Sequence, residues 1–358
     1  MSRRNAAFTL VELMIAMAIV MLVLYAAINF FIVSVRQYKV QTKITETNVE
    51  GILGLELLRL DLESLGYGLP WNNLPSYSEA SPVLLNDDGA APRAVVSIDC
   101  TSLGINNGSD YLVIKSTRVG MDDAAGKWTT LRAGLVTRDW GSAEENLVAG
   151  DHVVVLSPGS STTDQRVLMT PYDGADFGNL ASYVPGDAFQ TNIVYGIGSM
   201  ATRFPFNRAD FYIVDNPLYP TPRHCAPITG TLVKRVVKHS DGTLDNPLPL
   251  LDCVADMQVV YGIKSSPTDN LVTYIPNQAS FYPPASSTPT AADIRSQLVE
   301  VRVHILAQEG QRDDSYTTPS DTIFVGSQGV GRNFDVSGYR NYRWKQYSIS
   351  VKPKNLAQ

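Results

Sequence analysis

The most regular feature of the chain is a long, almost entirely apolar run of residues close to its N-terminus. Residues 13–35 include no formally charged side chain. Roughly 23 helical residues at ~1.5 Å each extend about 35 Å, which is enough to cross the hydrocarbon core of a bilayer. We therefore predict a membrane-spanning helix over residues 8–35.

Beyond Val35 the apolar residues become periodic, and charged residues separate them. Helical spacing relates Ile44, Ile52, Leu55, Leu58, Leu62 and Leu65. This pattern predicts an amphipathic continuation of the same helix over residues 36–66, with one face on an apolar surface. Helix-breaking residues then end it, namely Gly66, Gly68 and Pro70. Inside it, Gly51 and Gly54 indicate either a close-packing point or a bend, and the pattern leaves both open.

The rest of the chain alternates between β-prone segments and turns rich in Gly, Pro and Asn. The clearest predicted strands are Val95–Ile98, Tyr111–Thr117, His152–Leu156, Phe211–Val214, Thr231–Val237, Met257–Ile263, Leu298–Leu306 and Tyr347–Val351. Residues 266–293, rich in Pro, Ser, Thr and Ala, predict a surface loop. We therefore expect an α+β fold: one long helix packed on an antiparallel sheet, with a β-rich extension, and a β-rich body over residues 67–358.

Charge is distributed unevenly along the chain, whose formal net charge is −6. The first 43 residues hold five of the 29 basic side chains and one of the 35 acidic ones, which leaves the remainder close to −10. Phosphate binding needs clustered Lys and Arg, so a body this acidic excludes nucleic acid as the main partner.

Small residues precede the apolar run instead of following it. Ala6 and Ala7 lie directly before Phe8, whereas a secretory signal places its small residues after the apolar stretch. Cleavage between Ala7 and Phe8 would remove a leader of residues 1–7 and leave the apolar helix on the mature protein. Arg3 and Arg4 favour a cytoplasmic leader by the positive-inside rule. Basic residues on the far side, Arg36 and Lys39, oppose that orientation.

One carboxylate interrupts the apolar pattern at its start. Glu12 is costly at the edge of a membrane span, and such groups usually have a partner. Cleavage before Phe8 would create an α-amino group four residues away. On a neighbouring chain, that amine would pair with Glu12 and set the register of stacked helices. The alternative is that Glu12 lies at the headgroup level without a partner.

The string Phe8-Thr-Leu-Val-Glu-Leu13, with its short basic leader and long apolar run, closely resembles the class III signal of type IV pilins and type II secretion pseudopilins. The resemblance implies that a prepilin peptidase cuts before Phe8 and that the new N-terminus is methylated. It implies that Glu12 is needed for methylation and filament assembly. The family usually has Gly before the cut where this chain has Ala7, which is small enough for us to expect processing.

Later strings are similar to the PilW type of minor pilin. They are Leu55–Tyr67, Gly108–Ile114, Gly150–Val155, Val254–Gly262 and Tyr342–Val351. The resemblance implies a subunit that primes assembly or caps the tip of a type IV pilus, with other minor pilins, the major pilin and a PilY-type tip adhesin as partners. It implies a single-pass inner-membrane protein with a periplasmic body that later enters the extracellular pilus. The alternatives are a J-type pseudopilin and a tip module that binds an adhesin or a surface.

The three cysteines leave several pairings open. Outside the cytoplasm two can join and one remains. We favour Cys225 with Cys253, and the alternatives are Cys100 with Cys225 or three reduced thiols.

Other candidate chemistry is weak, and we expect neither an enzyme nor a bound cofactor. The spacing of His224, Cys225, His239 and Cys253 matches no compact zinc motif. Asp313, Asp314 and Asp321 lack a calcium-loop pattern, which favours a solvated acidic turn. The glycines of residues 326–331 follow a strand-like segment but lack the glycine order and the following helix of a dinucleotide site.

Overall fold

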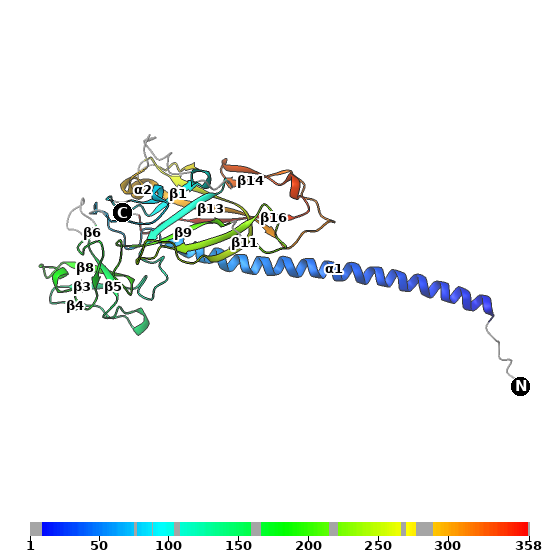
Figure 1. The fold of residues 1–358 in the computed structure, drawn as a ribbon, viewed down its shortest axis with the longest axis horizontal. Helices are drawn as coiled ribbons and strands as arrows, with labels where there is room; N and C mark the ends of the chain where they lie inside the picture. Colours follow the sequence, from blue (N-terminus) through cyan, green and yellow to red (C-terminus); the bar gives the residue numbers. More distant parts are fainter. Residues whose placement is uncertain are drawn as a thin grey trace, which may run out of the picture.

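The computed structural model describes residues 9–74, 77–87, 89–103, 108–158, 166–214, 221–265, 270–276 and 289–356. One long helix projects from a β-rich body, and the N-terminal end of that helix lies far from the body (Figure 1). The predicted α+β fold, a long N-terminal helix packed on an antiparallel sheet, is confirmed.

The long helix, α1, runs without interruption over Leu10–Glu63. Its 54 residues extend about 80 Å at ~1.5 Å each. No proline interrupts this stretch. The chain leaves the helix through Gly66 and Gly68, whose φ angles of 73° and 70° lie in the left-handed region that favours glycine. The helix ends at Glu63, three residues before the predicted bound of residue 66, and the two glycines lie in the turn that follows it.

The main sheet contains eight strands, all paired antiparallel. Its order is β1-β2-β9-β10-β11-β13-β16, with the short β12 also paired to β11. The bounds are β1 Val95–Asp99, β2 Asp110–Ser116, β9 Asn207–Val214, β10 Gly230–Val236, β11 Leu248–Ile263, β12 Thr273–Ile275, β13 Leu298–Glu309 and β16 Arg343–Val351. Seven of the eight predicted strands lie in this sheet.

A second sheet belongs to a segment inserted between β2 and β9, which are neighbours in the main sheet. We call residues 117–206 the inserted lobe. Its strand order is β4-β3-β8-β5-β6 with β7 also on β5, and the bounds are β3 Trp128–Arg132, β4 Val136–Thr137, β5 His152–Ser157, β6 Val167–Leu168, β7 Ala175–Asp176 and β8 Thr191–Gly198. The lobe lies at the end of the molecule opposite the free end of α1 (Figure 1). The eighth predicted strand is β5.

Shorter elements complete the described chain. Strands β14 (Thr322–Ser327) and β15 (Val330–Asp335) form a hairpin, and helix α2 covers Ala291–Gln297. Single 3₁₀ turns are η1 Val83–Leu85, η2 Cys100–Leu103, η3 Ala143–Glu145, η4 Ala181–Tyr183 and η6 Ser337–Tyr339. The predicted loop over residues 266–293 is wrong in part, because β12 and the start of α2 fall inside it. The sequence on either side of β12 is polar, but residues 273–275 form a strand because they pair with β11.

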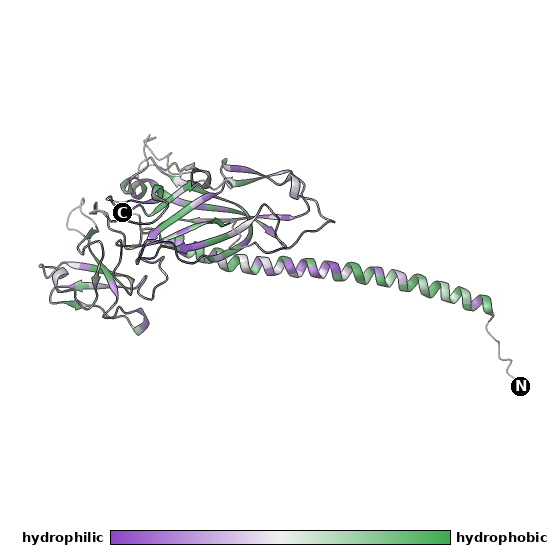
Figure 2. Ribbon diagram, viewed as in Figure 1, coloured by the Kyte–Doolittle hydropathy of each residue, from purple (hydrophilic) through white to green (hydrophobic). Residues whose placement is uncertain are grey.

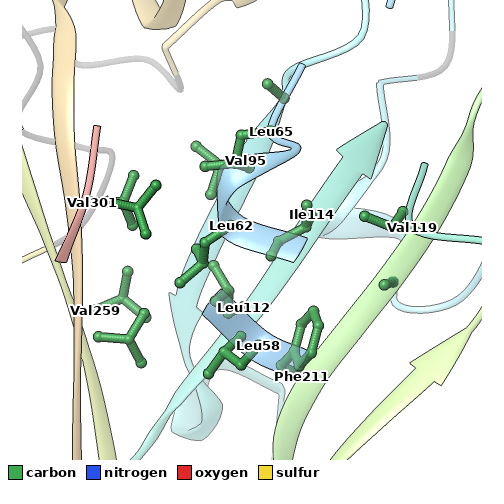
Figure 3. Close-up of a cluster of buried hydrophobic side chains, with 14 of the residues drawn as sticks. Leu58, Leu62, Leu65, Val95, Leu112, Ile114, Val119, Phe211, Val259 and Val301 are labelled. Carbon is green, nitrogen blue, oxygen red and sulfur yellow. The ribbon is translucent and has the colours of Figure 1, made fainter. Parts of the chain in front are cut away.

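The C-terminal part of α1 forms the centre of the core. Leu58, Leu62 and Leu65 are fully buried. They lie among side chains from five strands of the main sheet, including Val95, Leu112, Ile114, Phe211, Val259 and Val301 (Figure 3). Full burial of one such leucine contributes roughly 1.5–3 kcal/mol. The predicted amphipathic face is therefore confirmed at these positions.

Ile52 does not belong to that face, contrary to the sequence pattern. Its side chain is 63% exposed, and Leu53 is 67% exposed. The contact face passes through Gly51, Leu55 and Leu58, and position 52 is turned about 100° from position 51 around the helix axis. The middle of α1 consequently presents apolar side chains to the outside as well as to the sheet.

Gly54 marks a close approach of backbone to backbone. A Cβ atom at this position would lie 1.7 Å from the carbonyl oxygen of Leu250 in β11. At Gly51, one turn earlier, a Cβ would meet side chains instead of backbone: Leu251 Cδ1 at 3.2 Å and the Tyr347 hydroxyl at 3.5 Å. The helix remains continuous through both positions. Close packing, not a bend, is the reason for glycine at position 54.

A network of buried ion pairs holds the segment before β1 against the main sheet. The Lys115 ammonium lies 2.7 Å from a Glu79 oxygen and 2.5 Å from an Asp87 oxygen. Arg208 contacts Glu79 at 3.1 Å and Asp210 at 2.7 Å. Burial alone would raise the pKa of Asp87, but the charges of Lys115 and Arg93 outweigh it and lower that pKa. The buried acidic and basic side chains of this network thus neutralise one another within the core.

The glycine contact predicts a difference between two substitutions one turn apart. Gly54→Ala should lower the free energy of unfolding by at least ~1–3 kcal/mol, because the new methyl group meets backbone that cannot rotate away. The measurement is thermal or chemical unfolding of the full chain in detergent, followed by circular dichroism.

Gly51→Ala is the matched control. The Leu251 side chain can move, and alanine is favoured over glycine in a helix by roughly 0.8–1.0 kcal/mol, so no loss of stability is expected. Equal stabilities for the two variants would contradict the assigned docking of α1 on β11.

Candidate functional site

The first 34 residues of α1 stand free of the body and form an apolar surface. We call residues 10–43 the exposed arm. Its large apolar side chains from Leu10 to Tyr38 are 36–77% exposed. Its most apolar stretch contains no buried residue. Figure 2 shows the same contrast between the apolar outer part of α1 and its more polar middle. The arm is long and apolar enough to cross a membrane.

The start of the arm is closed by a reciprocal pair of side-chain bonds. Thr9 is the N-cap, and its hydroxyl accepts a hydrogen bond from the Glu12 backbone N–H at 3.4 Å. In return, Glu12 Oε2 accepts from the Thr9 backbone N–H at 2.9 Å and from the Thr9 hydroxyl at 2.8 Å. Together these bonds satisfy donors that a helix start leaves unpaired. Glu12 therefore has a role inside its own chain that the sequence analysis missed, although the Thr-x-x-Glu pattern is visible there.

The second oxygen of Glu12 is open to a further partner. Its side chain is exposed, and within the described residues only Oε2 of the carboxylate accepts hydrogen bonds. The cap also fixes the carboxylate at the first turn of the helix. The predicted cleavage position, Ala7 and Phe8, and the leader arginines lie outside the described residues.

The arm joins the body at a set of polar contacts with β16. Asn48 Oδ1 accepts hydrogen bonds from Lys345 Nζ at 2.8 Å and from the Tyr347 hydroxyl at 3.0 Å. One turn earlier, the Ile44 side chain lies beside Gly310. Charged residues precede this junction, with an ion pair of 2.6 Å between Lys43 and Glu46. Within about two turns, α1 thus changes from an exposed apolar helix to a helix that packs on the main sheet.

The cysteines form one disulfide, between Cys225 and Cys253, across a Cα–Cα distance of 5.1 Å. Cys100 is buried and reduced, and burial raises its pKa to about 12. Ligand atoms of His224, Cys225 and Cys253 lie within 4.8 Å of one another, but both thiols are in the disulfide. His239, the fourth member of the weak zinc pattern, instead accepts a hydrogen bond from the Arg203 backbone N–H at Nδ1 and contacts Asn207.

The acidic residues considered for calcium each have an arginine partner. Arg343 lies 3.0 Å from Asp313, Arg312 lies 2.9 Å from Asp314, and Arg340 lies 3.1 Å from Asp321.

The glycine-rich stretch of residues 326–331 forms the ends and the turn of the β14–β15 hairpin. Gln328 and Gly329 have positive φ angles there, as a tight turn requires.

Comparison with protein families yields two matches at opposite ends of the chain. Residues 2–28 match the prokaryotic N-terminal methylation motif, and residues 210–355 match the type IV pilus-assembly protein W family. The second match covers the main sheet from β9 to β16. Searches of curated proteins and of solved structures each gave no match.

These matches agree with the architecture described above. The methylation motif overlaps the first part of the exposed arm, which is the membrane anchor. The motif implies processing by a prepilin peptidase and assembly with other pilins. The family matches indicate a structural component of a pilus. Together, the two matches and the architecture support a type IV pilin-like protein, whose residues 210–355 are similar to the PilW type of minor pilin.

Proposed function

We propose that this minor pilin primes assembly of a type IV pilus or caps its tip. The observation that supports this role is the combination of an exposed apolar arm with a bulky body at its other end. Before assembly the bilayer covers the arm, and in a filament the helices of neighbouring subunits replace the lipid. A body with two sheets crowds its neighbours least at an end of the filament.

The proposed arrangement in the membrane follows from the arm. A leader of residues 1–7 is removed by cleavage between Ala7 and Phe8, residues 8–35 span the inner membrane, and the body of residues 67–358 lies in the periplasm. After assembly the body is extracellular. Other minor pilins, the major pilin and a PilY-type tip adhesin are the proposed partners.

Glu12 is the proposed assembly carboxylate. Its cap with Thr9 holds one oxygen, which leaves the other for the α-amino group of Phe8 on a neighbouring subunit. Because an unpaired carboxylate at the membrane edge is costly, this pairing would set the register in which neighbouring helices stack.

The first prediction concerns processing. Mass spectrometry of the mature protein purified from its native membrane should find an N-terminus at Phe8 with one added methyl group. A protein that retains Met1, or that begins downstream of residue 35, would falsify the assignment.

The second prediction separates the two roles of Glu12. Glu12→Gln should still be cleaved, yet should enter sheared pili at least about tenfold less than the wild type, because it loses the charge that attracts the amine. The measurement is the ratio of protein in the pilus fraction to protein in the membrane fraction.

Thr9→Ala is the matched control, because it breaks the cap but keeps the carboxylate. A lost N-cap typically costs about 1 kcal/mol, so assembly should persist in this variant. Equal assembly defects in the two variants would mean that Glu12 acts only as a cap.

The third prediction concerns position and system. Immunogold labelling of sheared pili should place the protein at filament ends, and deletion of its gene should remove surface pili. Uniform labelling along the filament would contradict the tip role. Loss of protein export with normal pili would instead identify a type II secretion pseudopilin.

A further inference from the structure

The inserted lobe contains a cleft that neither family match reaches. Its volume is about 550 Å³, within the range of roughly 300–1,000 Å³ typical of small-molecule sites. Two segments line it, residues 118–128 and residues 140–145, and all of these residues are described. They fall between the two matched stretches, 2–28 and 210–355.

Two tryptophans form one wall of the cleft. The rings of Trp128 and Trp140 lie 4.6 Å apart between centroids, at 54° to each other. The indole N–H of Trp140 donates to the backbone oxygen of Trp128 at 2.6 Å, and the guanidinium of Arg138 lies 4.2 Å above the Trp140 ring. These contacts hold Trp140 in place. The Trp128 ring is partly buried. Within the described chain its indole N–H donates no hydrogen bond, which leaves this donor open to a ligand.

The polar groups around the rings carry both signs of charge. Asp123, Glu144 and Glu145 contribute acceptors, and Arg118 and Lys127 contribute donors. None of these five side chains forms an ion pair or a hydrogen bond with another described residue, apart from the stacking of Arg118 on Tyr67 at 5.8 Å. Free donors and free acceptors therefore surround an aromatic wall.

This combination selects a class of ligand. The lining holds three carboxylates and two basic groups, so a ligand with charge of one sign only would meet side chains of the same sign as well as of the opposite sign. A sugar hydroxyl both donates and accepts, so it can use both kinds of group. The C–H groups on a sugar face carry partial positive charge and pack well on the negative face of an indole ring.

We propose that this cleft is a saccharide-binding site. In it the Trp128 and Trp140 rings pack against a sugar face, Glu144 and Glu145 accept hydrogen bonds from hydroxyl groups, and Lys127 donates one. The lobe lies at the end of the molecule away from the membrane arm, where a cell-surface or extracellular glycan can approach it (Figure 1). The proposal rests on the cleft and does not depend on the assembly role.

The test uses the full chain, purified in a detergent without a sugar headgroup. A glycan array identifies binders, and chitotriose and cellotriose are then titrated as soluble probes while tryptophan fluorescence is recorded. The wild type should bind at least one array glycan or soluble probe. The double variant Glu144→Gln, Glu145→Gln should bind that glycan at least about tenfold more weakly, because charge-assisted hydrogen bonds become neutral ones.

Asp173→Asn is the control, since Asp173 is an exposed acid of the same lobe outside the cleft. It should bind like the wild type, and both it and the Glu144→Gln, Glu145→Gln double variant should keep the wild-type melting temperature. Trp128→Phe should reduce both affinity and the fluorescence response. Absence of binding to every array glycan and both soluble probes, equal affinity of the double variant, or binding of choline in place of sugars would overturn the proposal.

Discussion

The contact between α1 and β11 is the constraint on which the rest of the molecule depends. At Gly54 the helix approaches so closely that a Cβ atom would overlap the Leu250 carbonyl oxygen. Leu58 and Leu62 can then reach the middle of the sheet and become fully buried. Because one rigid helix continues into the exposed arm, this contact also sets the direction in which the membrane anchor leaves the body.

The same helix must suit two surroundings. Its outer part exposes large apolar side chains, which are stable only in lipid or against other helices, and its inner part is docked by leucines and by the Asn48 bonds to β16. The polar stretch between them lies where an interface with water is expected. Apolar side chains remain exposed on the docked part as well, at Ile52, Leu53, Leu57 and Leu60.

The body shows how a large insertion can be accommodated without disturbing the main sheet. β2 and β9 pair directly although the whole inserted lobe separates them in sequence. Next to this junction, the network of Lys115, Glu79, Asp87 and Arg208 neutralises charges that would be costly to bury singly. The inserted lobe has its own core and its own surface, including the tryptophan cleft. The main sheet remains continuous beside it.

Sequence alone was sufficient for the parts of this protein governed by local periodicity. The long apolar run, the leucines of the docked helix, the glycines at its end and all eight predicted strands are local patterns, and the structure contains each of them. The Phe8–Leu13 string also led to the family, because leader, aromatic residue, carboxylate and apolar run must occur together.

Tertiary structure decided everything that depends on residues distant in the chain. The exposure of Ile52, the packing role of Gly54, the pairing of Cys225 with Cys253 and the buried ion pairs require knowledge of which strand faces which side chain. β12 is a strand only because β11 supplies its partner, and the cleft exists only because residues 118–128 and 140–145 fold against each other. Periodicity along the chain reports burial of a face, but it contains no information about what covers that face.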